Sequence, residues 1–326
     1  TSSQSYTGDT TISGGTLQLG NGSTVVSLAG TNIINNGNLA LNYGGDATVA
    51  NNISGTGNLQ VTGASYTLFN TNLTTTPQVI ASGTTVAEVL YRLSGGRMSG
   101  TAATAGGPAR ETGAYAKGFD ALTNTGTLQM QFYDGTYTKT IFVKLTQSGG
   151  NVMAAIDNAS PYSIGTAYTM ANILGTNMAS GYAYDMPLAT TYGGGGYGLD
   201  RLYSASKITL TGNNSYTGTT TISNTTTTVS TGMNQYSATA FGTLQFDAGI
   251  PSSGSISNSG LLIFNGSTAQ SSSLVVSGAG VLLKNGTNTL TLTGTQSYTG
   301  PTIVNAGTLQ FGNGGTTGLM ASSSSL

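Results

Sequence analysis

Short stretches in which apolar and polar residues alternate recur at both ends of this chain, separated by Gly and Asn. Three of them contain apolar residues two positions apart: Leu17 with Leu19, Leu39 with Leu41, and Leu59 with Val61. Residues two apart share one face of a strand, so the intervening Gln18, Ala40 and Gln60 are expected to face outward. Gly and Asn tolerate positive φ and suit tight corners. The pattern therefore predicts many short strands joined by corners.

A longer motif recurs three times and starts with Tyr-Thr-Gly. Its copies begin at Tyr6, Tyr216 and Tyr298, and each runs through a Thr-containing strand into a second strand that reads Gly-Thr-Leu-Gln. The first and last copies have the same spacing between their two strands, whereas the middle copy is expanded between Ile222 and Gly242. Recurrence of one strand-and-corner unit is the sequence signature of a repeat architecture.

A single unit of this kind cannot bury its apolar face, but stacked units form a continuous core. The sequence therefore predicts an all-β fold in which successive turns pair their strands in parallel, a β-solenoid or parallel β-helix. With about 200 residues outside the insert described next, and a period of roughly 20–25 residues, we expect about 8–10 turns. Apolar patterns with the period of a helix are scarce.

The composition changes between residues 84 and 207. This stretch holds eight of the nine basic residues, seven of the ten acidic residues and 11 of the 17 tyrosines. Charged and aromatic residues at this density indicate a globular domain rather than solenoid turns. We therefore predict three parts: solenoid over 1–83, an inserted small β-sandwich-like domain over 84–207, and solenoid again over 208–326.

The centre of the insert predicts a β-meander. Its strands are expected over 127–133, 137–147 and 152–156, and the Asp134-Gly135 pair between the first two is a strong signal for a tight turn. A short helix is expected over 86–93.

Charged residues make up only 6% of the chain, the net charge is −1, and Cys, His and Trp are absent. Without Cys there are no disulfides and no Cys nucleophile, and without His the commonest general base and metal ligand are missing. The small net charge provides no electrostatic footprint for nucleic acid. No apolar run is long enough to span a bilayer. We expect no cofactor, no metal and no enzymatic activity.

Four carboxylates in the insert are the candidates for catalysis: Asp134, Asp157, Asp185 and Asp200. A pair of carboxylates can act on a glycosidic bond, and parallel β-helices host enzymes that act on polysaccharides, so such an enzyme is one alternative. We favour turn and solvated roles for these residues, because nothing in the sequence brings two of them together.

One segment matches the calcium-binding nonapeptide Gly-Gly-x-Gly-x-Asp-x-apolar. It runs from Gly195 to Leu202 and makes Asp200 a calcium candidate. Such sites take ligands from consecutive copies of the nonapeptide, and here a single copy is present. A flexible glycine loop over 193–196 is the simpler interpretation.

The tyrosines fall into two groups with different expected roles. Tyr6, Tyr216 and Tyr298 recur in the repeat, which predicts a structural role at a corner rather than a carbohydrate-stacking stripe. Tyrosines of the insert are the candidates for a binding surface, because Tyr is enriched at interfaces. They are Tyr182, Tyr184, Tyr192, Tyr197 and Tyr203.

The pattern Leu-Thr-Gly-x-x-x-Tyr-Thr-Gly-x-Thr-x-Ile, followed by Gly-Thr-Leu-x-Phe-Gly, resembles the autotransporter-associated β-strand repeat. Its best copies run from Leu292 to Gly312 and from Leu210 to Ile222, with the N-terminal copy from Tyr6 to Gly20. The resemblance implies a secreted protein of the bacterial cell surface with a right-handed parallel β-helix passenger. It implies nothing specific about activity.

Three hypotheses for the function remain open. The first is an extracellular structural protein whose solenoid stacks head-to-tail into filaments, because the two ends of a solenoid carry strand edges that need capping and end-to-end contacts give open assemblies. The second is an adhesin whose insert binds a glycan or a host protein. The third is the polysaccharide-acting β-helix enzyme. The expected partners are further copies of the chain and a surface ligand, with no nucleic acid and no membrane insertion.

Overall fold

The computed structural model describes residues 2–30, 32–63, 65–69, 76–94, 110–133, 138–157, 202–231 and 234–320, some strand residues by their backbone alone. Its contacts divide the chain into two units. The solenoid unit comprises Thr1–Tyr66, Ala205–Thr225 and Ala240–Leu326, and the inserted unit comprises Thr67–Ser204 and Thr226–Thr239.

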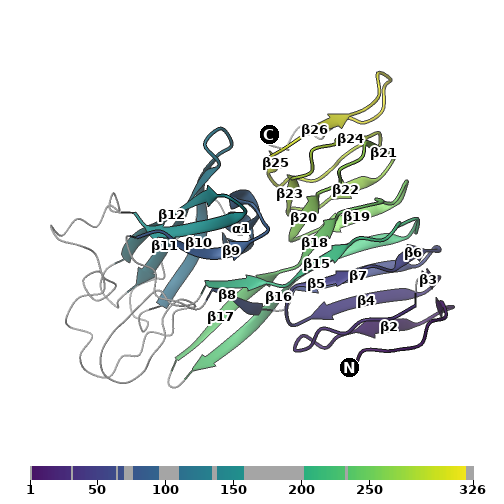
Figure 1. Ribbon diagram of the computed structural model, residues 1–326, viewed down its shortest axis with the longest axis horizontal. Helices are drawn as coiled ribbons and strands as arrows, with labels where there is room; N and C mark the ends of the chain where they lie inside the picture. Colours follow the sequence, from purple (N-terminus) through teal and green to yellow (C-terminus); the bar gives the residue numbers. More distant parts are fainter. Residues whose placement is uncertain are drawn as a thin grey trace. The chain divides into compact units, whose positions relative to one another are not determined.

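Two parallel sheets form the first and second sides of the solenoid unit, and their strands follow one another from purple to yellow in Figure 1. The first side contains β2 (Thr16–Leu19), β4 (Asn38–Tyr43), β7 (Asn58–Gly63), β16 (Thr219–Thr231), β19 (Ser255–Asn258) and β22 (Val275–Ser277). The second side contains β5 (Ala47–Val49), β15 (Lys207–Leu210), β18 (Thr243–Phe246), β20 (Leu261–Phe264), β23 (Val281–Lys284) and β25 (Thr302–Val304).

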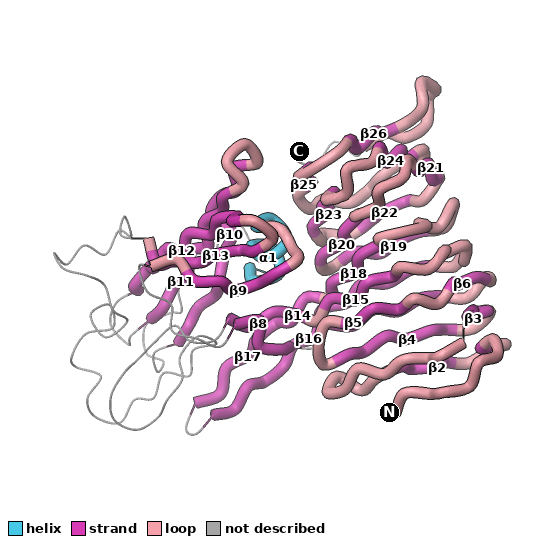
Figure 2. The backbone as a smooth tube through the Cα atoms, in the orientation of Figure 1, coloured by secondary structure: helices cyan, strands magenta, loops and turns pink. Residues whose placement is uncertain are grey.

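The third side consists of two short parallel sheets, one in the early turns and one in the late turns. They contain β1 (Thr10–Ile12), β3 (Asn32–Asn35) and β6 (Asn52–Ser54), and then β21 (Gln270–Ser272), β24 (Thr289–Leu292) and β26 (Thr308–Phe311). Strands and corners alternate along the tube of Figure 2. The described residues make about nine turns, which confirms the predicted all-β, parallel β-solenoid fold.

The strand register gives the length of a turn. Thr243 pairs with Leu261, and Thr10 pairs with Ile33, so one turn takes about 18–23 residues. Each turn visits the three sides in the same order, and the corners are only a few residues long except at the two excursions described below. The register therefore holds each residue directly beside its counterpart in the next turn.

Inward-facing aliphatic and aromatic side chains fill the solenoid. Leu39 and Leu41 are fully buried, as are Leu59 and Val61 in the next turn, which confirms the predicted inner face. Farther along, the rings of Phe246 and Phe264 stack with their centroids 5.9 Å apart. This column of like residues is the core that stacked units were expected to provide.

One outward position departs from the expected exposure. Gln18 and Gln60 are exposed, whereas Ala40 between them is 7% exposed. Gln18, Ala40 and Gln60 lie side by side in three successive turns. The longer side chains of Gln18 and Gln60 therefore cover the short methyl group of Ala40 from solvent.

Five described strands of the inserted unit form one antiparallel sheet, in the order β10-β11-β12-β13-β9. Its elements are β9 (Gln78–Ser82), β10 (Arg110–Asp120), β11 (Thr125–Tyr133), β12 (Thr138–Ser148) and β13 (Asn151–Ile156). The predicted meander is confirmed as β11-β12-β13. Where we expected a sandwich-like domain, the described residues show this sheet together with a helix.

The predicted helix is confirmed as α1 (Val86–Ser94). The hydroxyl of Thr85 accepts a hydrogen bond from the backbone N–H of Glu88 at 3.2 Å, which caps the N-terminus of the helix. Glu88 also pairs with Arg92 at 3.5 Å, one helical turn farther on. The helix packs against β10 and β11.

The units divide the chain at different positions from the three predicted parts. The first division falls after Tyr66 rather than at 83/84, because β9 pairs with β13 and so belongs to the sheet of the insert. The second falls at Ala205, close to the predicted 207/208. The expansion of the middle repeat is a hairpin of β16 with β17 (Asn234–Phe241). Two further strands, β8 (Ser65–Phe69) and β14 (Leu202–Ala205), pair with each other.

Candidate functional site

Most of the predicted binding and metal residues lie outside the described residues. These are Tyr182, Tyr184, Tyr192, Tyr197 and the calcium candidate Asp200. The fifth tyrosine, Tyr203, lies on β14, where the backbone alone is described. The proposed binding surface of the insert therefore stays a prediction.

The carboxylates offered for catalysis are similarly placed. Asp134, Asp185 and Asp200 lie outside the described residues. Asp157 directly follows β13, and its backbone N–H donates to the carbonyl oxygen of Phe142 at 2.8 Å. Across the described part of the chain, no three His, Cys, Asp or Glu side chains gather in a way that could hold a metal ion.

The tyrosines of the repeat have a structural role in the two later copies. Tyr216 and Tyr298 are 1% and 0% exposed, and each hydroxyl is hydrogen bonded to the Thr four residues later, at 2.7 and 2.6 Å. Burial raises the pKa of both phenols. A buried, hydrogen-bonded ring cannot stack on a carbohydrate, so the predicted corner role holds for these two residues.

The matching tyrosine of the first copy is in a different environment. Tyr6 makes the same hydrogen bond, to Thr10 at 2.5 Å, but the residue is 43% exposed. We expect Tyr216→Phe and Tyr298→Phe each to lower the free energy of unfolding by about 1–2 kcal/mol, because a buried Thr hydroxyl loses its partner. Tyr6→Phe is expected to change it by less than about 0.5 kcal/mol. Urea denaturation followed by circular dichroism measures all three, and equal losses would contradict this argument.

Close contact between successive turns explains why the Tyr-Thr-Gly motif contains glycine. A Cβ at Gly218 would overlap the carbonyl oxygen of Gly57 in the preceding turn, and one at Gly300 would overlap that of Gly280. Around Gly8, in the first copy, nothing lies within 4 Å of the Cβ position. The first copy thus has glycine at the position where the later copies contact a preceding turn, although the described residues include no turn on that side of Gly8.

The exposed face of the first turn is hollowed. The hollow has a volume of about 680 Å³ and is lined by residues between Ser2 and Leu28, among them Tyr6, Ile12 and Leu17. Leu17 is half-buried and packs against the solenoid core from this side. We call this side the first-turn face; it bounds the apolar column formed by the described residues.

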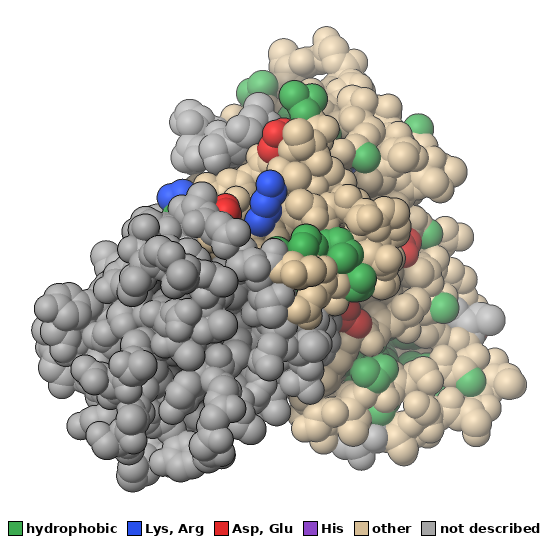
Figure 3. Space-filling model, turned by 60° about the vertical axis from the view of Figure 1, so that its left-hand side comes forward, with side chains coloured by type: hydrophobic (Ala, Val, Ile, Leu, Met, Phe, Trp, Pro, Cys, Tyr) green, Lys and Arg blue, Asp and Glu red, His purple; other side chains and the backbone are tan. Residues whose placement is uncertain are grey.

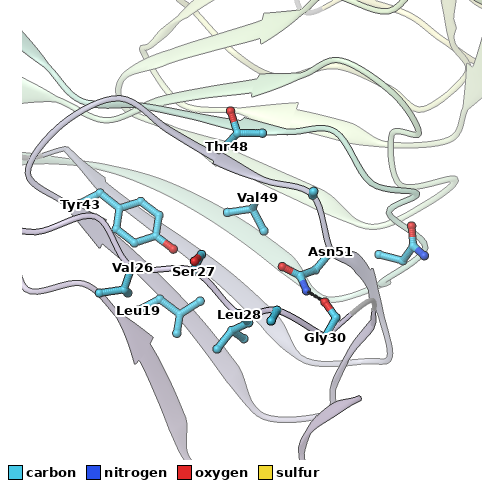
Figure 4. Close-up of a pocket in the computed structure, with 12 residues that line it drawn as sticks. Leu19, Val26, Ser27, Leu28, Gly30, Tyr43, Thr48, Val49 and Asn51 are labelled. Carbon is cyan, nitrogen blue, oxygen red and sulfur yellow. Dashed lines mark hydrogen bonds between the residues drawn. The ribbon is translucent and has the colours of Figure 1, made fainter. Parts of the chain in front are cut away.

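A second hollow, of about 320 Å³, lies between the first and second turns (Figure 4). Residues 24–27 form no strand there, and the ring of Tyr43 points across the hollow toward Ser27. Burial raises the pKa of Tyr43 to about 12, so its phenol is neutral at physiological pH. The residues that line this hollow include no group that titrates near neutrality, so none of them is suited to act as a general acid or base.

Lys284 is the one fully buried lysine among the described residues. Its Nζ donates to the carbonyl oxygens of Gly286 and, at 3.4 Å, Ala306. Burial lowers its pKa. The amine joins the corners of two successive turns, so we assign it a structural role.

Both excursions from the solenoid leave at the same corner, between the first and second sides. The first starts after β7, and the second starts within β16, the strand that pairs with β7 in the next turn. Ile222 of β16 pairs with Val61 of β7 just before the two strands diverge. The inserted unit is made from these two excursions.

The solenoid continues in register across the first excursion. Asp46, Asn52 and Asn58 accept hydrogen bonds from the backbone N–H groups of residues exactly 161 positions later, Lys207, Asn213 and Thr219, at 2.7–3.0 Å. Identical offsets at three points of one turn mean that the excursion interrupts the sequence without disturbing the stack.

Fold and repeat together define the class: a parallel β-solenoid protein built from repeats of the passenger type. The family described as passenger-associated-transport-repeat matches residues 1–19, 205–229 and 282–311, which are the three copies of the Tyr-Thr-Gly motif. The resemblance inferred from the sequence is thereby confirmed.

Among curated proteins, the chain is similar to the adhesin BmaC autotransporter of Brucella suis biovar 1 (strain 1330). The two are 52% identical over 54 residues, which is 17% of this chain and 2% of the adhesin's length. No solved structure matches the chain. Among the described residues, no helix combines the length and apolar character needed to cross a bilayer.

Proposed function

We propose that this chain is an extracellular, adhesin-like protein of the bacterial surface, in which the solenoid is a non-enzymatic shaft and the inserted unit carries recognition. The passenger-type repeat and the short match to an adhesin support the location and the class. The assignment of support to the solenoid and of recognition to the inserted unit rests on the unbroken strand register across the first excursion. Because the shaft does not need the excursion for its own stacking, the excursion is free to serve binding.

The surface chemistry favours short-range recognition. On the face shown in Figure 3, the described surface is mostly neutral polar side chains and backbone, with few Lys, Arg, Asp or Glu. Such a surface gives little long-range steering of a charged ligand. Stacking of tyrosine rings on a glycan or on a protein needs no net charge, which keeps Tyr182, Tyr184 and Tyr192 as the residues to test.

The structure specifies a clean deletion for this test. Tyr43 pairs with Gly63, and Asp46 lies beside Lys207, so joining Gly63 directly to Ala205 reproduces the corner that follows β4. We expect a chain lacking residues 64–204 to keep the parallel strands of its solenoid and its urea midpoint. In cell-adhesion and glycan-array assays it is expected to lose binding.

Two controls make the adhesion result decisive. Deleting the second excursion by joining Asn224 to Phe241 alters the same corner one turn later, and removes much less of the inserted unit. Undiminished binding by a folded chain lacking 64–204 would contradict recognition by the insert. Loss of binding by the Tyr→Ala variants at 182, 184 and 192, with unchanged stability, would localise it further.

A second function rests on the regularity of the stack. Successive turns pair through parallel ladders in one register, and such a ladder can be continued by a turn of a second copy. We propose that solenoid ends associate head-to-tail, so that the shaft assembles into filaments. Electron microscopy of concentrated protein is expected to show fibres, and monomers at every concentration would exclude them.

A further inference from the structure

Resting on the proposed role of the inserted unit in recognition, we propose that the tip of the β10–β11 hairpin, residues 121–124, binds a protein partner by placing Leu122 in an apolar pocket. Leu122 is 99% exposed, the highest value for a large apolar side chain among the described residues. It therefore buries almost no apolar surface in the fold of its own chain. Turns favour Gly, Pro, Asn, Asp and Ser, so the local structure gives no reason for a leucine at this position.

The loop that carries Leu122 is held by its own hydrogen bonds. The Asp120 carboxylate accepts from the backbone N–H of Leu122 and from the hydroxyl of Thr123, both at 2.9 Å. The bond from Thr123 lowers the pKa of the Asp120 carboxyl, which is therefore ionised at neutral pH. The Thr123 hydroxyl is also hydrogen bonded to that of Thr125 at 2.8 Å. Because the backbone of Leu122 is positioned before a partner arrives, less conformational entropy is lost on binding.

The base of the hairpin stands on the packed part of the inserted unit. Ala116 on β10 pairs with Leu128 on β11, and both are fully buried. The helix α1 lies so close to β11 that a Cβ at Gly126 would be 3.1 Å from the side chains of Val86 and Leu90. A contact residue on such a support keeps its position better than one on an unsupported loop.

The last residue of the tip departs from ordinary structure in two ways. Asn124 has a φ of 48°, and it is the one non-glycine residue with a positive φ in the described part of the chain. Its side-chain oxygen is enclosed and has no hydrogen-bond partner. Such departures cost free energy and concentrate at functional sites. A single exposed leucine is ordinary on a protein surface, but one beside Asn124 on a fixed loop indicates a surface shaped for contact.

The chemistry of the tip favours a protein partner over a glycan. Ala121 and Thr123, on either side of Leu122, are exposed and neutral. The carboxylate of Asp120 is already occupied by donors of the loop itself. Residues 121–124 include no aromatic ring that could stack on a sugar. An aliphatic side chain suits an apolar pocket instead, as anchor residues of protein interfaces do.

Adhesion of the purified chain to epithelial-cell monolayers tests this contact. Leu122→Ser is expected to raise the concentration for half-maximal binding by about ten- to a hundredfold, the change that corresponds to burial of one leucine side chain. Its urea midpoint is expected to stay unchanged, because the leucine is fully exposed. Ala121→Ser, at the exposed neighbouring position, is the matched control and should bind normally. Leu122→Met keeps an apolar side chain of similar volume and should bind within about threefold of the original chain.

Two further measurements identify the class of partner. Treating the monolayers with trypsin removes surface proteins and is expected to abolish the difference between the original chain and Leu122→Ser. Phosphatidylcholine vesicles and glycan arrays are expected to bind both chains equally or not at all. Binding to vesicles that depends on Leu122 would assign the tip to a lipid surface, and binding to the arrays that depends on Leu122 would assign it to a glycan. Either result would overturn the protein pocket.

The chain lacking residues 64–204 separates this contact from the proposed function of the inserted unit. If that chain loses adhesion while Leu122→Ser keeps it, the hairpin contact is wrong and recognition by another part of the insert stands. If both chains adhere as well as the full chain does, both proposals are wrong. Absence of adhesion by the full chain would overturn both as well.

Discussion

Replacing Gly300 by Ala is expected to lower the free energy of unfolding of the solenoid unit by about 3 kcal/mol, the upper part of the usual range for an overpacked site. The new Cβ would overlap the carbonyl oxygen of Gly280 and lie 2.7 Å from that of Ala279. Both are backbone oxygens of the corner between β22 and β23, where the N–H of Gly280 is hydrogen bonded to the carbonyl oxygen of Asn258 in the preceding turn, so neither can move aside without disturbing the contact between turns.

Gly8→Ala is the matched control, because it changes the same position of the same motif. With nothing within 4 Å of its Cβ, the substitution is expected to be neutral or slightly stabilising, since Ala restricts the unfolded chain more than Gly does. Neither glycine has a positive φ, so the comparison isolates contact between turns from backbone strain. Urea midpoints measured by circular dichroism decide it, and similar losses for the two variants would show that the close approach between turns is unimportant.

Local patterns were enough to predict the elements of the solenoid. The i, i+2 spacing of Leu39 with Leu41 and of Leu59 with Val61 predicted the buried face, and repetition of the motif predicted stacking. The meander of the insert also followed from alternation, together with the Asp-Gly turn signal. These features could be predicted because each depends on residues that are close in sequence.

Two strands of the insert, β9 and β10, were not predicted. Strand β10 contains two register shifts against β11, next to Gly113 and Gly118, and its charged residues further obscure the period of two. Residues 78–82, which form β9, were placed in the solenoid because the change in composition begins only after them, and the partner strand, β13, lies some 70 residues away. Sequence spacing cannot identify such a distant partner.

The sequence of the repeat also does not indicate which side of the solenoid each copy occupies. The Tyr-Thr-Gly motif precedes β1 on the third side, β16 on the first side and β25 on the second side. Since all three corners make similar demands on the chain, one motif serves each of them. The copies therefore mark corners, and their number does not equal the number of turns.

The role of buried asparagines was not predicted from the sequence, where Asn was interpreted only as a corner residue. Asn258 ends β19 fully buried, with its Nδ2 donating to the carbonyl oxygen of Val281 and its Oδ1 accepting from the N–H of Gly260, both at 3.0 Å. Asn35 ends β3 and makes the equivalent pair of bonds, to Asn58 and Gly37. The spacing Asn-x-Gly at the end of a short strand is the signal that could have revealed both.

Asn258→Ala is accordingly expected to lower the free energy of unfolding by about 2–4 kcal/mol, because it leaves a backbone carbonyl and a backbone N–H buried without partners. Asn224 provides the control: its Nδ2 donates to Ser259 at 2.8 Å in the next turn, but the site is exposed, so water replaces the lost bond and Asn224→Ala should cost less than about 1 kcal/mol.

Asn258→Asp separates the two bonds of the buried side chain. The carboxylate can still accept from Gly260, but it has no donor for Val281 and places a charge in the core, so at neutral pH it should be at least as damaging as Ala. Urea denaturation of the three variants provides the comparison. If Asn258→Ala and Asn224→Ala proved equally mild, buried side-chain bridges between turns would contribute little, and the stability of the solenoid would rest on its apolar column and backbone ladder.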